Sequence, residues 1–232
     1  MLFLTTLVIT TVLVVALQKP LKRWPVVFYV LALLMSGVYV YAILFGAAVE
    51  LWRYFLIYMQ RCMIALSLFT LVMFAAVFPN NSRPYNLLMG LRRELSITGF
   101  FFAVGHIVAY LHNFLPRLMG FAVDTRTNLM ISLAIALVIT ALLVLLTVTS
   151  FTVVRRAMSQ TAWKRVQLLA YPFYLLVYVH LMFVLLPSAL AGGANASVTI
   201  TVYTLLFASY SVLRVRKVIV ASRSTELAPQ ED

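Results

Sequence analysis

Long apolar segments, separated by short polar segments, run through the chain from its first residues to about position 213. A transmembrane helix needs about 20 consecutive apolar residues to cross the hydrocarbon core of a bilayer. By that measure the pattern predicts seven transmembrane helices. They cover about 1–18, 25–48, 54–78, 95–115, 128–154, 166–187 and 196–213. Residues 187–197, PSALAGGANAS, are rich in small residues and supply the turn between the last two helices.

The composition supports this interpretation, because 64% of the residues are hydrophobic and only 10% are charged. Soluble domains contain about a quarter charged residues. The first apolar segment lacks the basic residues that begin a signal peptide, and its positive charges follow it instead. The sequence therefore predicts an all-α, polytopic membrane helix bundle with about seven transmembrane helices, including a retained N-terminal helix.

The basic residues are distributed unevenly between the two sides of such a bundle. Alternating crossings bring 14 of the 18 Lys and Arg residues to one side. They are Lys19, Lys22, Arg23, Arg83, Arg92, Arg93, Arg155, Arg156, Lys164, Arg165, Arg214, Arg216, Lys217 and Arg223. Because Lys and Arg accumulate in cytoplasmic loops, we expect an inner (cytoplasmic) cell membrane location, with the N-terminus outside and the C-terminus in the cytoplasm.

Several classes of function find no support in the sequence. The net charge of +12 comes from short loops between apolar segments, so nucleic acid is not an expected partner. Cys62 is the one cysteine, so no internal disulfide can form. No GxGxxG segment or phosphate-binding loop occurs, and chemistry with nicotinamide or a flavin domain would have to come from a partner.

Two histidines lie deep in separate apolar segments. His106 is 13 residues past Arg93, and His180 is 15 residues past Arg165. These spacings correspond to roughly 20 and 22 Å of helix from the basic side, which places both imidazoles in the outer half of the membrane. Two parallel helices with imidazoles at matching depth can hold haem iron from both faces. The alternative is that each histidine forms a hydrogen bond to a neighbouring helix.

Three further residues are candidates for contacts with such a cofactor. His112 is rotated about 240° from His106 around the helix, so it can contact the rim or a propionate but not share the same face. Arg61 is either a propionate partner or a side chain that extends to the outer interface. Gly105, like Gly99, would let a ring or a neighbouring helix approach closely.

Two segments carry a resemblance to a known family. LRRELSITGFFFAVGHIVAYL (91–111) and SFTVVRRAMSQTAWKRVQLLAYPFYLLVYVHLMF (150–183) resemble the ferric-reductase-like transmembrane family. The resemblance is closest to its bacterial branch, the haem-binding membrane subunit of the periplasmic methionine sulfoxide reductase system. It implies a b-type cytochrome with His106 and His180 as metal ligands, and electron transport across the membrane.

The chain also departs from the pattern of that family. The wider family often carries a second histidine on each of the two helices, 13 or 14 residues away, for a second haem. Here those positions hold Arg92 and Gln167. We therefore expect one haem b, in the outer half of the membrane. The basic inner end can instead receive a quinone or the phosphate of FMN, or its charges can serve only to set the topology.

The leading hypothesis is the electron-transfer subunit of an oxidoreductase system rather than a complete enzyme. Electrons would pass from a quinol, or a cytoplasmic flavin or partner, to an extracytoplasmic redox protein. The alternative is a cofactor-free membrane anchor or assembly subunit of a larger complex. In either case the expected parts are an additional transmembrane helix (1–24), a ferric-reductase-like haem-binding domain (25–220) and a disordered cytoplasmic tail (221–232).

Overall fold

The computed structural model describes residues 2–46, 50–118 and 127–226, and regular secondary structure within these ranges is entirely helical. This confirms the all-α membrane bundle. The helices are α1 (Leu2–Ala16), α2 (Gln18–Arg23), α3 (Pro25–Phe45), α4 (Glu50–Gln60), α5 (Met63–Ala75), α6 (Arg83–Leu118), α7 (Thr127–Val148), α8 (Thr152–Ala157), α9 (Gln160–Leu168), α10 (Ala170–Leu190) and α11 (Ala194–Glu226).

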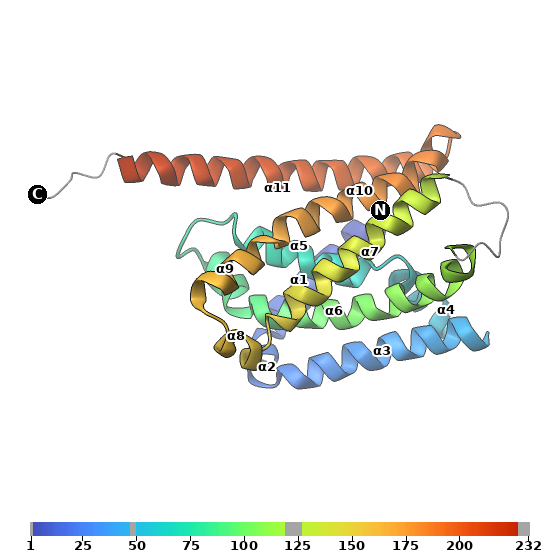
Figure 1. Ribbon diagram of the computed structural model, residues 1–232, viewed down its shortest axis with the longest axis horizontal. Helices are drawn as coiled ribbons and strands as arrows, with labels where there is room; N and C mark the ends of the chain where they lie inside the picture. The colour runs from blue at the N-terminus through green and yellow to red at the C-terminus, as the bar shows by residue number, and fades with distance from the viewer. Residues whose placement is uncertain (1, 47–49, 119–126, 227–232) are drawn as a thin grey trace, which may run out of the picture.

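The long helices run alternately in opposite directions through the bundle. In Figure 1, α3, α6 and α10 run from left to right, and α1, α5, α7 and α11 return. Within the described residues, five segments are long and apolar enough to cross a membrane, while α1 and α5 are shorter apolar helices. Together they account for the seven expected crossings, and α6 and α10, which carry the two histidines, are parallel as predicted.

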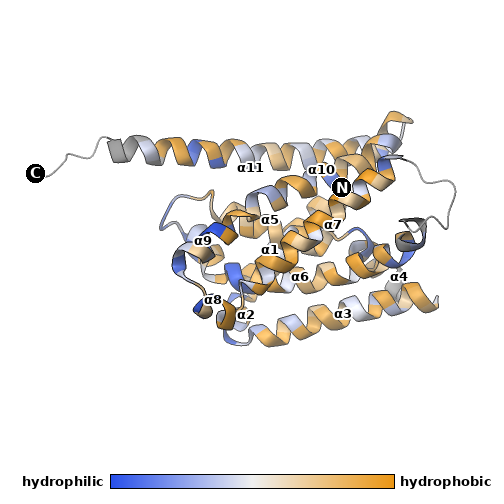
Figure 2. Ribbon diagram, viewed as in Figure 1, coloured by the Kyte–Doolittle hydropathy of each residue, from blue (hydrophilic) through white to orange (hydrophobic). Residues whose placement is uncertain are grey.

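Hydrophilic residues gather where α2, α8 and α9 lie, at one end of the bundle (Figure 2). We call this the basic end, because α2, α8 and α9 carry Lys22, Arg23, Arg155, Arg156, Lys164 and Arg165. Two cations there lie over aromatic rings: Arg23 over Trp24, at 4.9 Å from the ring centroid, and Arg155 over Trp163, at 4.6 Å. The clustering of positive charge at one end agrees with the distribution expected from the sequence.

The prediction of one continuous helix over 54–78 is wrong. The chain breaks after Gln60, turns through Arg61 and Cys62, and resumes as α5 at Met63. Cys62 adopts a left-handed backbone conformation with φ of 52°, which an α-helix cannot continue through. The Arg61 side chain is exposed at this break rather than enclosed by the other helices.

Two other helices are longer than the sequence pattern indicated. α6 begins at Arg83 instead of about 95, and its 36 residues reach about 54 Å at 1.5 Å per residue. Its polar first part therefore extends beyond a hydrocarbon core about 30 Å thick. α11 continues through 221–226, the first half of the segment expected to be a disordered tail, and 227–232 lie outside the described residues. Only the turn at 191–193 separates α10 from α11, inside the predicted segment.

The core is built from aromatic side chains of several helices. Phe69 of α5 meets Phe173 of α10 edge to face, with ring centroids 5.4 Å apart, and Tyr174 stacks on Phe207 of α11 at 4.3 Å. Leu143 of α7 completes the same cluster. Such packing, rather than exclusion of water, holds helices together in a bilayer, where the lipid is as apolar as the side chains.

α3 and α6 pack closely at a serine and a glycine. Ser36 is buried and its Oγ donates a hydrogen bond of 2.6 Å to the carbonyl of Phe101. A Cβ added to Gly105 would lie 3.0 Å from the Ser36 Cβ and 3.1 Å from its Cα. The close approach that Gly105 permits is therefore to a neighbouring helix, one of the two alternatives that the sequence left open.

This contact predicts a difference between two glycines of the same helix. Gly105→Ala should lower the thermal unfolding temperature in detergent, because the new methyl group must displace α3, at a cost of about 1–3 kcal/mol. Gly90→Ala is the matched control, since a Cβ there meets nothing within 4 Å. Alanine should stabilise that position by up to about 1 kcal/mol. Equal unfolding temperatures for the two variants would contradict the close contact.

Candidate functional site

His106 of α6 forms a hydrogen bond with the main chain of α4. Its Nδ1 lies 2.7 Å from the carbonyl oxygen of Gln60. The Tyr110 ring, one helical turn further along α6, lies against the imidazole with centroids 4.5 Å apart. The imidazole is therefore held by a helix distant in sequence and by a neighbour on its own helix.

The break between α4 and α5 makes this carbonyl available. The last carbonyls of a helix have no intrahelical partner. Gln60 is the last residue of α4, and after the break the amide of Leu66 bonds instead to the carbonyl of Cys62. The irregular segment that the sequence did not predict thus supplies the acceptor that orients His106.

His180 of α10 is held in the same manner by α7. Its Nδ1 lies 3.0 Å from the carbonyl oxygen of Ser132 and 2.9 Å from the Oγ of the same residue. Ser132 is buried, and α7 packs extensively against α10. Both histidines, although on different helices and with different partners, therefore use the same ring nitrogen for a main-chain contact.

These contacts determine the tautomer of each neutral imidazole. A carbonyl oxygen only accepts hydrogen bonds, so the His106 contact requires a protonated Nδ1. The Ser132 carbonyl favours the same tautomer of His180, whereas the alternative tautomer would accept from the Ser132 hydroxyl. Nε2 then presents a lone pair, which is the form in which a histidine binds a metal. Within the described residues, neither Nε2 has a hydrogen-bond partner. A second hydrogen bond from Nδ1 to a carbonyl is also how metal-binding histidines are commonly oriented.

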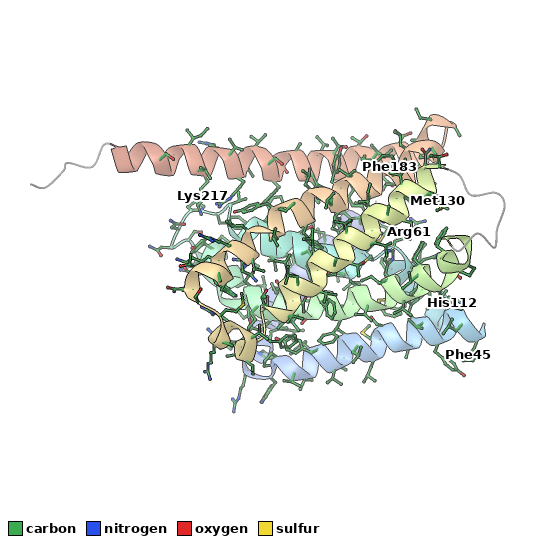
Figure 3. The ribbon with its side chains drawn as sticks, viewed as in Figure 1. Phe45, Arg61, His112, Met130, Phe183 and Lys217 are labelled. Atoms are coloured by element: carbon green, nitrogen blue, oxygen red, sulfur yellow. The ribbon has the colours of Figure 1, made fainter. Side chains whose placement is uncertain are left out.

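The two imidazoles belong to one region of the bundle. His106 lies on α6 and His180 on α10, two helices that run in the same direction through the bundle. These helices do not pack extensively on one another: α6 packs mainly on α3 and α5, and α10 on α7 and α11. Figure 3 labels three residues that are close in sequence to these groups: Arg61 next to Gln60, Met130 near Ser132 and Phe183 near His180. All three lie on the side of the bundle away from the basic end.

The other three predicted site residues lie on the break between α4 and α5 and on α6. Arg61 follows directly after Gln60 in the break, next to the carbonyl that bonds to His106. His112 is exposed near the end of α6 (Figure 3). Gly105 contacts α3, as described above, so a contact between Gly105 and a cofactor stays a prediction.

Two aromatic residues on the helices that carry the histidines pack on other helices. The Tyr178 ring lies 5.2 Å from that of Phe207, and its hydroxyl lies 3.0 Å from Thr204 Oγ1. Phe101 packs toward Tyr29 of α3, with centroids 6.0 Å apart. Sequence reasoning did not identify Gln60 and Ser132, because a main-chain carbonyl leaves no signature in residue type.

Arg92 and Gln167, which the sequence resemblance matches to the inner histidines of the wider family, both line one pocket of about 380 Å³ at the basic end. Gln167 Nε2 donates a hydrogen bond of 3.1 Å to Thr149 Oγ1. Trp163 Nε1 donates to the Thr149 carbonyl at 3.0 Å. The described residues include no group of three or more His, Cys, Asp or Glu side chains that could hold a metal ion.

The hydrogen bonds predict one tautomer for His106 and His180, both of which are half-buried. In the metal-free protein with ¹⁵N-labelled histidine, NMR at pH 8, above the usual histidine pKa of about 6.5, should find protonated Nδ1 and unprotonated Nε2 for both residues. The exposed His112 serves as the internal reference, and a His112→Ala variant assigns its signals. A protonated Nε2 on either half-buried ring would contradict the geometry.

Comparison with known proteins gives two findings. The family described as ferric reductase like transmembrane component matches residues 61–178, just over half of the chain. The match includes His106 and ends two residues before His180. A protein of Treponema pallidum (strain Nichols), described as uncharacterized, is 40% identical over 218 residues, which are 93% of this chain and 60% of that protein. The chain thus spans about 60% of the length of this relative.

Proposed function

The chain belongs to the ferric reductase like transmembrane component family, and from this premise we propose that it is a membrane electron-transfer subunit that binds one haem b. His106 and His180 are the axial ligands in this proposal. The observation that carries it is the pair of imidazoles with Nδ1 bound to main-chain carbonyls and Nε2 without a partner among the described residues. Haem iron between two such ligands takes up and releases one electron at a time.

The set of donors favours haem over a metal ion bound by side chains alone. A structural or catalytic zinc site needs three or four protein ligands, and no group of that kind occurs among the described residues. A haem needs only two axial ligands, because the macrocycle supplies the other four nitrogen donors. Two histidines on parallel helices that each pack on other partners match this requirement.

The chain contributes orientation and charge to this site. Gln60 and Ser132 fix the rotation of the two imidazoles through their carbonyls. Arg61, exposed in the adjacent break, is proposed to form an ion pair with a propionate. His112 is proposed to contact the rim or a propionate, and Gly105, next to His106 in the chain, to permit close approach of the cofactor.

The proposed direction of electron flow follows from the charge asymmetry. If the basic end faces the cytoplasm of the cell membrane, as Lys and Arg in short loops indicate, the histidine pair lies toward the outer face. Electrons then enter from a quinol, a cytoplasmic flavin such as FMN or a partner protein. They leave to an extracytoplasmic redox protein, as in the methionine sulfoxide reductase branch that the sequence resembles.

The histidine ligands predict a loss of haem on substitution. Purified protein from haem-replete cells should give the reduced-minus-oxidised spectrum of a bis-histidine b-type cytochrome, with one haem per chain. His106→Ala and His180→Ala should each remove this absorbance, while His112→Ala, which removes only the proposed contact with the rim or a propionate and no ligand to the iron, should retain it. Size-exclusion profiles verify that the variants are folded. Wild-type protein without haem absorbance would instead support a cofactor-free membrane anchor.

The proposed ion pair between Arg61 and a propionate predicts that the reduction potential of the haem depends on the charge of residue 61. Removing a positive charge near the haem should disfavour the reduced form, so Arg61→Gln should lower the midpoint potential by on the order of tens of millivolts. Arg61→Lys retains the charge and should shift the potential less. Redox titration monitored by visible absorbance measures both variants. Identical midpoints for Arg61→Gln and the wild type would mean that Arg61 only extends to the interface.

A further inference from the structure

α11 carries a repeating pattern of exposed side chains along most of its length. Steps of three and four residues along the helix define one face, which we call the α11 stripe. All of its members are exposed: Val198, Thr201, Leu205, Ala208, Val212, Val215, Ile219 and Ser222. In each seven-residue unit the first position holds a larger aliphatic residue, and the fourth holds threonine, alanine, valine or serine. A sustained repeat of this kind is typical of a helix that pairs with another helix.

The opposite face of α11 packs against the rest of the bundle. Tyr203, Phe207 and Tyr210 are buried in the aromatic core. Among the described helices, α11 packs extensively only on α10, and it lies at the edge of the bundle (Figure 1). The α11 stripe therefore points away from the described part of the chain, and nothing in that part prevents a neighbour from approaching it.

At the basic end, α11 extends beyond the other helices (Figure 1). Arg214 donates a hydrogen bond of 3.3 Å to the Ala76 carbonyl, and Lys217 donates one of 2.6 Å to the Phe78 carbonyl. Both acceptors lie just past the end of α5. From Lys217, α11 continues to Glu226, roughly 14 Å further at 1.5 Å per residue. This projecting part follows a cluster of cations, so it lies outside the hydrocarbon core.

The α11 stripe stays apolar as the helix leaves the bundle. Val215 is 57% exposed and Ile219 is 46% exposed, and both border a groove that runs along α11. Outside the hydrocarbon core, lipid tails cannot cover such a patch, and an exposed apolar patch in water marks an interaction surface. α11 contains no proline or glycine. It therefore has no residue at which it would bend to lay these side chains on the membrane surface.

The occupant of the α11 stripe must run beside the helix both inside and outside the membrane. Lipid can cover the part around Leu205 but not Ile219, and a water-soluble protein can cover Ile219 but not Leu205. A second copy of α11 has the required length and projects to the same side. Two copies with one topology place these helices parallel and in register about a two-fold axis. We propose that two copies of this chain pair along the α11 stripe.

The residue types on the α11 stripe fit a parallel pair. Ala208 and Ser222 are small, which lets two backbones approach closely where lipid competes for apolar surface. Arg214 and Lys217 are held by their own bundle, away from the stripe. Arg216 flanks the stripe, and in a parallel pair it lies opposite Ser211 of the partner subunit, so like charges do not meet. The pairing involves neither proposed haem ligand and therefore does not depend on the haem proposal.

Cysteine cross-linking in the membrane tests this contact. Val215→Cys places a thiol on the α11 stripe, where an in-register pair brings it to its counterpart. Oxidation with copper phenanthroline should then give a dimer on a non-reducing gel. Val220→Cys is the matched control, because residue 220 is 56% exposed but lies off the stripe. It should remain monomeric, as should the wild type, whose Cys62 is partly buried. No dimer with Val215→Cys, or equal cross-linking of the two variants, would overturn the proposal.

The number of copies per assembly gives an independent test. In lipid vesicles, single-molecule photobleaching of the full-length protein should find pairs that dissociate as the protein is diluted in lipid. Ala208→Phe should weaken pairing about 10- to 100-fold, because the ring separates the two backbones. Leu213→Phe, exposed but off the α11 stripe, should leave pairing unchanged. Both substitutions are apolar and exposed, so the fold is retained.

Three results of the dilution experiment would overturn the proposal. They are monomers at every density, assemblies larger than two, and equal effects of Ala208→Phe and Leu213→Phe. Monomers would mean that lipid covers the membrane part of the α11 stripe and that a different protein covers its projecting part. Haem absorbance should be the same in paired and unpaired protein, so loss of haem in His106→Ala bears only on the other proposal.

Discussion

A polar group at the depth of the hydrocarbon core must find its hydrogen-bond partner inside the protein, because the lipid offers none. This constraint accounts for most polar contacts in the bundle. Ser36 bonds to a carbonyl of α6, Thr70 to a tyrosine of α10, and Ser132 to His180. Each of these contacts joins helices that are distant in sequence, and so specifies which helices are neighbours in an otherwise uniform apolar interior.

The break between α4 and α5 is explained by the same constraint. A continuous helix over 54–78 would leave no carbonyl for His106. Interrupting the helix frees the Gln60 carbonyl, which then bonds to His106 Nδ1. Irregular backbone at membrane depth is tolerated where protein groups satisfy it, and here the imidazole does so.

The sequence predicted the apolar helices well, because twenty apolar residues leave few alternatives in a membrane protein. It also identified His106 and His180, since histidines are conspicuous in apolar segments. The partners of these histidines could not be predicted, because any residue type can supply a main-chain carbonyl. The extension of α6 to Arg83 was missed for a related reason: hydropathy marks the part of a helix within lipid, not where the helix itself begins.

The two ends of the bundle differ in the kind of polar group that is left over. Toward the end away from α8 and α9, the surplus groups are two imidazole Nε2 atoms, which have lone pairs and suit a metal. At the basic end, Arg92 and Lys164 line a pocket, and both side chains donate hydrogen bonds and carry positive charge. The sequence resemblance matches Arg92 and Gln167 to the inner histidines of the wider family, and neither side chain offers the lone pair of an imidazole nitrogen. A second haem held by two histidines would therefore have no axial ligand at these two positions.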